Sequence, residues 1–341
     1  MKAVAYSIKA FEKEFLAKAN QKKHDITLIS NPLGIETTNY AEGKEAVIVF
    51  TNDDVSAKVI DRLSELGIRY IVTRSAGTDH INKLAAARHG IKIANIPDYS
   101  SEAIAEHAAA LAFALNRKLI KADKHSHQFN FKNDSLMGFN FSGKTIGLIG
   151  VGNTGMATAK IFNGLGCKVI GYDINFPADN TIIQEVSLQE LYATADIISL
   201  HAPLTTDTKH IINHDALQKM KNGVMLINTS RGALLNTYDV LKALQSGKIG
   251  YLGLDVYEFE KGLFFEDHEH DQVKDELLIK LLQFDNVLIT PHQAYLTKEA
   301  LQTISNQTIS NLDMWQQNEC AGKACACIKS CQTAPLSENK F

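Results

Sequence analysis

The chain has 341 residues, of which 45% are hydrophobic and 21% are charged, and its formal net charge at pH 7 is -3. This length accommodates two domains that each bury a core of their own. The small net charge and the lack of dense Lys or Arg runs argue against a nucleic-acid or acidic-membrane partner. No apolar run approaches the roughly 18 residues of a membrane span, and the N-terminus does not have the pattern of a signal peptide. The sequence therefore predicts a cytoplasmic protein.

Short β-branched runs alternate with helical stretches along the chain, which is typical of α/β proteins with parallel sheets. The first runs predict a smaller sheet, with strands near Val4 to Tyr6, Ile26 to Ile29, Ala46 to Phe50, Arg69 to Val72 and Lys92 to Ala94. A helix from Ser101 to Asn116 follows, and small residues surround most of its circumference. Such a helix is expected to be buried, between domains or between subunits. His107 on this helix is interpreted as an interface histidine with satisfied hydrogen bonds.

A glycine-rich turn, G-x-G-x-x-G, joins an apolar strand to a helix between Lys144 and Met156. The first glycine permits the tight turn, the second lets the backbone approach a pyrophosphate, and the third lets the helix pack against the strand. The N–H groups at the start of the helix are predicted to bind the phosphates. The residues predicted to hold the dinucleotide here are Gly150, Gly152, Asn153, Thr154 and Gly155.

A second strand ends at Asp173, at the interval expected for a βαβ unit. A carboxylate at this point accepts hydrogen bonds from the ribose hydroxyls and repels a 2′-phosphate, so the pattern predicts NAD rather than NADP. Six strands are predicted in this second sheet, namely Thr145 to Ile149, Lys168 to Tyr172, Ile197 to Leu200, Val224 to Asn228, Tyr251 to Val256 and Val287 to Ile289.

A last helix, from about Lys298 to Gln316, follows the second sheet and is expected to return to the first domain. The predicted fold is therefore α/β, with two doubly wound parallel sheets. A Rossmann NAD-binding domain is predicted over residues 101–297, and a smaller flavodoxin-like substrate domain over residues 1–100 and 298–341. The cofactor cleft is expected between the two domains.

Three polar residues, Arg231, Glu260 and His292, follow predicted strands at the sheet edge where open α/β sheets bind ligands. A guanidinium binds a carboxylate through two parallel hydrogen bonds. A histidine donates a proton to a carbonyl oxygen, and a carboxylate beside it stabilises its charged form. Together the three residues supply what the reduction of a 2-keto acid requires.

Several segments resemble the D-isomer-specific 2-hydroxyacid dehydrogenases, and among them the bacterial D-lactate dehydrogenases most. The resemblance extends from about residue 40 to residue 316. The segments that carry it are Arg74 to Thr78, Asp98 to His107, His201 to Thr205, Asn228 to Leu234, Asp255 to Asp267 and Pro291 to Thr297. Asn236 departs from the family, which often has Asp there, and this change is expected to affect only a helix cap.

The resemblance implies that Arg231 binds the substrate carboxylate and keto oxygen, that His292 is the acid/base, and that Glu260 pairs with it. It further implies that backbone N–H groups of Ala76 and Gly77 help to hold the carboxylate. The other implied contacts are Asp255 to the nicotinamide carboxamide, Pro203 and Thr229 to the cofactor, and Tyr99, Phe50 and Tyr295 around the substrate.

The favoured function is reversible hydride transfer between NADH and pyruvate, giving D-lactate, and the long segment from Gly262 to Asp267 favours this branch. The first alternative is another 2-keto acid, either hydroxypyruvate, the partner of glycerate, or 2-ketoisocaproate. The second is a binding protein, because the same scaffold occurs in NAD-sensing transcriptional corepressors. The family and the Ala-rich helix indicate a homodimer.

Four of the five cysteines, Cys320, Cys325, Cys327 and Cys331, lie after the last predicted helix. They form no C-x-x-C pair and have no nearby histidine, so no metal site is predicted. A mobile, reduced tail is the favoured interpretation, and a soft-metal or redox role is the alternative. Deletion of the residues after Asn318 is expected to leave activity within a few-fold of normal.

Overall fold

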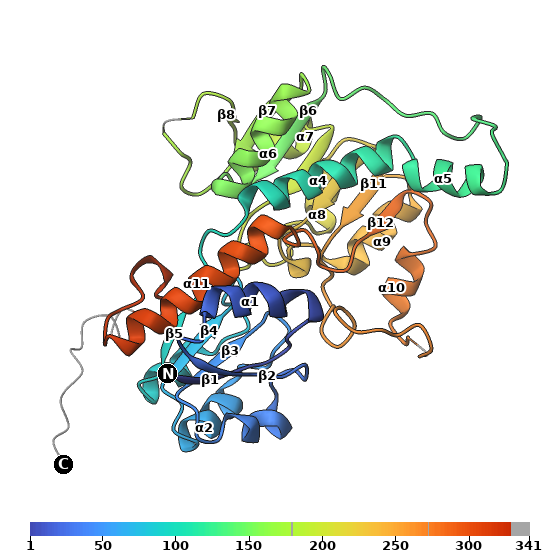
Figure 1. The fold of residues 1–341 in the computed structure, drawn as a ribbon. Coiled ribbons are helices and arrows are strands. Elements are labelled where there is room, and N and C mark those ends of the chain that lie inside the picture. The colour runs from blue at the N-terminus through green and yellow to red at the C-terminus, as the bar shows by residue number, and fades with distance from the viewer. Residues whose placement is uncertain (179, 272, 329–341) are drawn as a thin grey trace, which may run out of the picture. The chain divides into compact units, whose positions relative to one another are not determined.

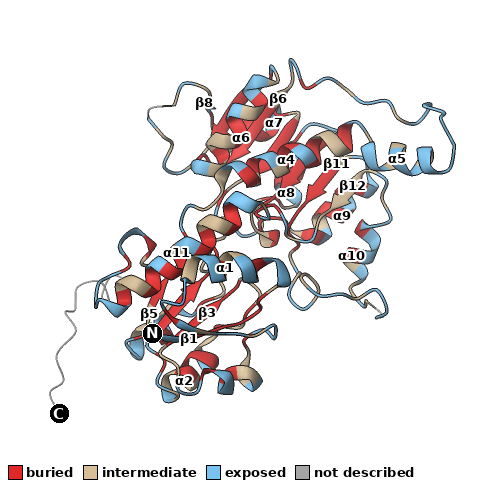
Figure 2. Ribbon diagram, in the orientation of Figure 1, coloured by how far each residue is buried: buried red, intermediate tan, exposed pale blue. Residues whose placement is uncertain are grey.

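The computed structural model of the protein describes residues 1–178, 180–271 and 273–328. The chain forms two compact units, which are described separately below. The first consists of Met1–Tyr99 together with residues 297–328, and the second is the segment Ser100–Leu296. In both units the buried residues concentrate in the strands and on the inward faces of the helices (Figure 2).

The first unit contains a five-stranded parallel sheet in the order β2-β1-β3-β4-β5. This order is that of flavodoxin-like folds, in which the chain reverses direction across the sheet between β1 and β3. The strands are β1 (Lys2–Ala5), β2 (Asp25–Leu28), β3 (Ala46–Val49), β4 (Tyr70–Thr73) and β5 (Lys92–Ala94). The helices are η1 (Ala10–Glu12), α1 (Lys13–Asn20), η2 (Ile35–Ala41), α2 (Ala57–Glu65), α3 (Lys83–Arg88), α11 (Lys298–Gln316) and η4 (Gly322–Ala324).

Alternate residues of these strands enter different cores, because successive side chains of a strand point to opposite faces. Val47 and Val49 join the core under α2 and α3, whereas Ile48 joins the core that α11 covers. The ring of Trp315 on α11 stacks on Tyr70 of β4 with ring centroids 4.8 Å apart. The last long helix thus completes the first sheet, as its sequence position predicted.

The segment after α11 is ordered against β5, so the expectation of a mobile tail is wrong for the residues up to 328. The Asn95 N–H donates to the Ala324 carbonyl at 2.9 Å, and the Ala326 N–H donates to the Ile93 carbonyl at 3.0 Å. The Ile93 N–H also donates to Cys327 Sγ at 3.2 Å. The physical reason is that β5 is a sheet edge whose backbone groups need partners. Cys331 lies outside the described residues.

Deletion of the residues after Asn318 is now expected to destabilise the first unit. The deletion removes the backbone partners of β5 and the side chains of Ala321 and Ala324, which are 3% and 4% exposed. We expect the Tm to fall by several degrees, and we expect the exposed edge strand β5 to promote aggregation. Thermal unfolding followed by light scattering measures both effects, with Cys320→Ser, at an exposed position, as the control. An unchanged Tm in the truncated protein would refute this prediction.

The second unit contains a seven-stranded parallel sheet in the order β12-β11-β10-β9-β6-β7-β8. Figure 1 labels β6, β7, β8, β11 and β12 of this sheet. The strands are β6 (Thr145–Ile149), β7 (Lys168–Tyr172), β8 (Gln184–Glu185), β9 (Ile197–Leu200), β10 (Val224–Asn228), β11 (Ile249–Leu254) and β12 (Val287–Ile289). The helices are α4 (Ser101–Asn116), α5 (Leu119–His127), α6 (Asn153–Gly164), α7 (Leu188–Thr194), α8 (His214–Lys219), η3 (Gly232–Leu234), α9 (Thr237–Gln245) and α10 (Glu276–Leu281). The sheet therefore has one strand more than predicted.

The chain reverses direction across this sheet between β6 and β9, which is the topological switch point of a doubly wound fold. The edge strand β8 was missed because it has two exposed polar residues and no apolar alternation. Cys167 is buried beside β7, and burial raises the pKa of its thiol to about 11. No helix in the described parts of the chain is long and apolar enough to cross a bilayer.

Candidate active site

The glycine-rich turn lies at the switch point of the second sheet and has the geometry that the sequence motif predicts. Gly150 has a φ of +93°, and a Cβ on it would collide with the backbone of Ala202. A Cβ on Gly155 would collide with the carbonyl of Gly150, so helix α6 packs directly on the turn. A Cβ on Gly152 would meet nothing within 4 Å. The turn therefore leaves open space at the start of α6, where an anion is favoured.

Asp173 lies at the end of β7 and holds this turn in place. Its carboxylate accepts hydrogen bonds from the Val151 N–H at 2.6 Å and from the Asn175 N–H at 2.9 Å. A carboxylate has about four lone pairs, so acceptor capacity remains for ribose hydroxyls. The contact with Val151 is a supporting role that the sequence did not indicate.

Two polar residues that follow β9 and β10 also fit a bound dinucleotide. Thr229, which follows β10, is 6% exposed, and no described residue pairs with its buried Oγ1. Such an atom is costly to bury alone, so it is available to bind a ligand. His201, which follows β9, pairs through Nε2 with Ser199 Oγ at 2.9 Å, and burial lowers its pKa to about 4. His201 is therefore neutral at pH 7. Pro203 is exposed, and its carbonyl accepts a hydrogen bond from Thr208 at 2.6 Å.

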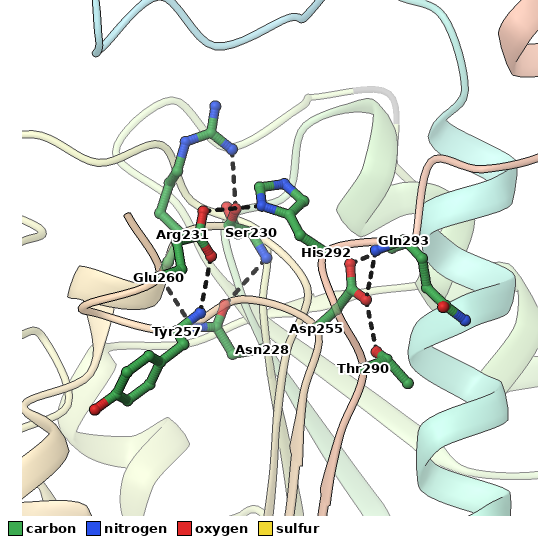
Figure 3. Close-up of polar contacts among 10 residues, drawn as sticks. Asn228, Ser230, Arg231, Asp255, Tyr257, Glu260, Thr290, His292 and Gln293 are labelled. Carbon is green, nitrogen blue, oxygen red and sulfur yellow. Dashed lines mark hydrogen bonds and ion pairs between the residues drawn. The ribbon is translucent and has the colours of Figure 1, made fainter. Parts of the chain in front are cut away.

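His292 and Glu260 form a direct pair, which Figure 3 shows with the ring turned toward the carboxylate. Glu260 Oε1 lies 2.9 Å from His292 Nδ1, and Glu260 Oε2 accepts a hydrogen bond from the Tyr257 N–H at 3.0 Å. The side chains of His292 and Glu260 are 15% and 26% exposed. Because Nδ1 is engaged by the carboxylate, Nε2 is the nitrogen left to exchange a proton with a substrate.

Asp255 holds the loop that carries His292. Its fully buried carboxylate accepts hydrogen bonds from Thr290 Oγ1 at 2.6 Å, the Gln293 N–H at 2.9 Å and the Ala294 N–H at 2.8 Å. His292 itself has a φ of +53°, a conformation that costs energy and persists only where the surroundings impose it. The structure thus gives Asp255 a loop-supporting role that sequence reasoning missed. Its contact with a nicotinamide carboxamide stays a prediction.

His107 joins the same network from helix α4. Its Nε2 lies 2.9 Å from Thr290 Oγ1 and 3.3 Å from Asp255 Oδ1. The interpretation of His107 as a histidine with satisfied hydrogen bonds agrees with these contacts, but its partners lie within the second unit. The alternation of apolar and small residues in α4 gave no signal for a contact so distant in sequence.

Arg231 follows β10 in a turn whose backbone is held from both sides. Asn228 Nδ2 donates to the Arg231 carbonyl at 2.9 Å, and Arg231 Nη1 donates to the Ser230 carbonyl at 2.9 Å (Figure 3). Ser230 Oγ donates in turn to the Ala202 carbonyl at 2.7 Å. The turn therefore carries the guanidinium at the same end of the sheet as the His292–Glu260 pair.

Phe265 is a further neighbour of the acid/base pair that sequence reasoning did not single out. Its ring lies 5.4 Å from the His292 ring, between centroids, with an interplanar angle of 39°. The residue belongs to the segment from Gly262 to Asp267 and has a φ of +68°. An apolar ring at this place reduces the contact of the imidazole with water.

The predicted substrate residues of the first unit lie after β3, β4 and β5. Ser75 Oγ donates to the Gly77 carbonyl at 2.8 Å, and Asn95 Nδ2 donates to the Ala76 carbonyl at 2.7 Å. Phe50 is buried, with the Arg74 guanidinium 5.2 Å from its ring centroid.

The two tyrosines belong to different units. Tyr99 ends the first segment of the first unit and is half-buried, whereas Tyr295 is buried in the second unit. The substrate roles of Ala76, Gly77, Phe50 and both tyrosines stay predictions.

Comparisons with known proteins agree with this geometry. Residues 109–294 match the D-isomer specific 2-hydroxyacid dehydrogenase, NAD binding domain. The D-lactate dehydrogenase of Escherichia coli is 40% identical over 323 residues, which cover 94% of this chain and 98% of that protein.

Two solved structures are similar over nearly the whole chain. One was described in the identification of the pyruvate reductase of Chlamydomonas reinhardtii. It has a TM-score of 0.88 and 41% identity over 94% of this chain and 98% of that one. The other is D-lactate dehydrogenase from Aquifex aeolicus complexed with NAD and lactic acid. It has a TM-score of 0.84 and 31% identity over 93% of this chain and 96% of that one. The chain therefore belongs to the D-isomer-specific 2-hydroxyacid dehydrogenases, a family of NAD-dependent oxidoreductases.

Proposed function

We propose that the protein is a D-lactate dehydrogenase, which interconverts pyruvate and D-lactate. The observation that carries the proposal is the His292–Glu260 pair at 2.9 Å, at the same sheet edge as Arg231 and in the unit that contains the glycine-rich turn. NADH, when bound, supplies the hydride that reduces the keto carbon. The relatives named for D-lactate and the neighbour named for pyruvate support this choice of substrate.

Each residue of the site has a defined task in this reaction. Arg231 binds the carboxylate and orients the keto oxygen, because its planar donors match a carboxylate. His292 as imidazolium donates a proton from Nε2 to the keto oxygen, and Glu260 stabilises the charge on the ring. The Ala76–Gly77 turn supplies further N–H groups to the carboxylate. We assign the NAD-binding role to the second unit and substrate contacts to the first.

The decisive experiment is an assay of NADH oxidation with pyruvate, run beside hydroxypyruvate and 2-ketoisocaproate. We expect pyruvate to have the largest kcat/KM and the product to be D-lactate by chiral analysis. A larger kcat/KM with either of the other keto acids would assign the substrate to that acid. NADH binding without turnover of any of the three would favour the corepressor-like alternative.

Replacement of Asp173 with Ala is expected to narrow the preference for NADH over NADPH. The parent enzyme should prefer NADH by a large factor in kcat/KM, since the carboxylate binds ribose hydroxyls and repels a 2′-phosphate. The variant loses both effects, and it also loses the hydrogen bond from the Val151 N–H. The KM for NADH should therefore rise more than the KM for NADPH. Steady-state kinetics with each cofactor measure the change. Equal use of both cofactors by the parent would contradict the assignment of Asp173.

Replacement of Glu260 with Gln is expected to lower kcat/KM for pyruvate reduction. Gln keeps the shape of the side chain but removes the negative charge that stabilises the imidazolium. Steady-state kinetics with pyruvate measure the loss. A kcat/KM equal to that of the parent would show that Glu260 does not act on His292 through its charge.

We further propose a homodimer in the cytoplasm. Five large apolar side chains of α5 and the loop after it are more than half exposed, and a second copy would cover them: Leu119, Ile120, Phe129, Phe131 and Met137. The location follows from a reaction that would draw on cytoplasmic NADH. Light scattering determines the mass in solution, and a monomer at micromolar concentration would contradict the dimer.

A further inference from the structure

A second histidine–carboxylate pair lies next to the catalytic loops, and the mechanism above does not use it. His210 Nε2 lies 2.6 Å from Glu258 Oε1. The other carboxylate oxygen, Glu258 Oε2, accepts a hydrogen bond from the Thr237 N–H at 3.0 Å. The side chain of Glu258 is 12% exposed, so each of its oxygens has a protein partner in a nearly closed environment. A carboxylate is retained in such surroundings only when it is paired.

The three partners come from three different segments of the second unit. His210 belongs to the loop after β9, and Thr237 is the first residue of α9, six positions after Arg231. Glu258 precedes Glu260 by two positions in the loop after β11. One carboxylate thus joins the segment that follows Arg231 to the loop that carries the partner of His292.

The backbone reinforces the same connection. The His210 N–H donates to the Ala233 carbonyl at 2.8 Å, and the Ile212 N–H donates to the Leu234 carbonyl at 3.1 Å. The loop of His210 is therefore attached to the chain directly after Arg231. His210 has a φ of +54°, which is unfavourable for a residue with a Cβ. This conformation persists because contacts on both sides of the residue impose it.

Gly232 shows how closely the two catalytic loops approach each other. A Cβ on Gly232, the residue after Arg231, would overlap with the backbone of Tyr257 and Glu258. The turn of Arg231 therefore rests on the backbone that leads to Glu260. A shift of Glu258 by a fraction of an ångström has to be transmitted to this turn, because no space separates the two.

We infer that His210 and Glu258 form a clasp that sets the position of Arg231 relative to the His292–Glu260 pair. The inference rests on the proposed function of these three catalytic residues. His210 and Glu258 are positioning residues, which act through the two loops that they join. The pairing also separates the roles of the neighbouring carboxylates, since Glu258 engages His210 and Glu260 engages His292.

The test compares His210→Ala, Glu258→Ala, the double variant and Glu258→Gln with the parent enzyme. A misplaced guanidinium weakens substrate binding and slows hydride transfer, and small displacements of this kind cost up to about 100-fold in rate. For either Ala variant we expect kcat/KM for pyruvate to fall about 10- to 100-fold, with part of the loss in kcat. The dissociation constant of NADH, measured by its fluorescence, should change less than kcat/KM, because the clasp does not support the glycine-rich turn. The double variant should be no worse than Glu258→Ala, since Glu258→Ala already removes the pair with His210. Glu258→Gln, which retains an acceptor, should recover part of the loss.

A second readout does not depend on turnover. Oxamate, which has the shape and charge of pyruvate but is not reduced, should bind the parent–NADH complex about ten-fold more tightly than the Ala variants. The matched control is His89→Ala, which removes a histidine–carboxylate pair at 2.7 Å with Asp61 in the first unit. This control should leave pyruvate kinetics unchanged.

The outcomes separate the two proposals. Folded Ala variants with kcat, KM and oxamate affinity within two-fold of the parent would overturn the clasp alone. A lower Tm with unchanged kinetic constants would also overturn it, because the pair would then serve only stability. A parent that neither reduces a keto acid nor binds oxamate would overturn both the clasp and the proposed function.

Discussion

His292→Ala should lower kcat/KM for pyruvate reduction by about 10²–10⁴-fold at every pH, the usual contribution of a positioned general acid. The structure supports this magnitude because the ring is oriented by Glu260 at 2.9 Å and its loop is held by Asp255. Stopped-flow measurement of a single turnover separates the hydride-transfer step from product release.

The affinity for NADH serves as the control for this variant. His292 follows β12, whereas the glycine-rich turn follows β6, so the substitution should leave the dissociation constant of NADH within about two-fold. A rate within ten-fold of the parent would mean that another group, or water, donates the proton.

Arg231→Gln should reduce kcat/KM for pyruvate by a similar factor, but for a different reason. A hydrogen bond to a charged partner contributes about 1.5–3 kcal/mol, and a bidentate guanidinium–carboxylate pair makes two of them. Their loss corresponds to about 10²–10⁴-fold in kcat/KM. Most of the effect should appear as a higher KM for pyruvate.

Arg231→Lys is the matched variant, because it retains the charge and removes the planar fork. We expect it to recover only a small part of the loss, and oxamate binding should follow the same order as the kinetics. Full recovery by Lys would show that a positive charge alone is sufficient, without bidentate geometry.

Much of the fold was predictable because the decisive signals are local. The Ala-rich pattern predicted α4 as Ser101–Asn116, and the last helical segment was predicted from about Lys298 to Gln316, which agrees with α11. The β11 strand begins at Ile249 rather than near Tyr251, because Gly250 interrupts the apolar run and lies where the register with β10 shifts. Contacts that lie far apart in sequence had no such signal, and the pairing of residues 324–327 with β5 was missed for that reason.

The candidate site shows the same difference between local signals, which the sequence carries, and distant contacts, which it does not. Arg231, Glu260 and His292 were accessible from sequence because each follows a strand, where the topology of a parallel sheet brings side chains together. The contacts of His107 and Phe265 with the loop of His292 depend on how helix α4 and the segment from Gly262 to Asp267 pack in three dimensions. The periodicity of a sequence does not predict such packing. Position in the sequence alone does not distinguish Glu258 from Glu260 as the partner of His292, and the positions of the side chains show that Glu258 engages His210.

The discontinuity of the first unit has a consequence for the order in which the protein folds during synthesis. Residues 1–99 leave the ribosome first, but the helix that covers one face of their sheet and the segment that pairs with β5 are made last. The continuous second unit can acquire its structure as it emerges, since domains generally fold as units during translation. The order of completion is therefore the reverse of the order of emergence. A chain released before residue 297 contains the nucleotide-binding unit attached to a sheet that lacks its covering helix, the kind of chain that chaperones and proteases recognise.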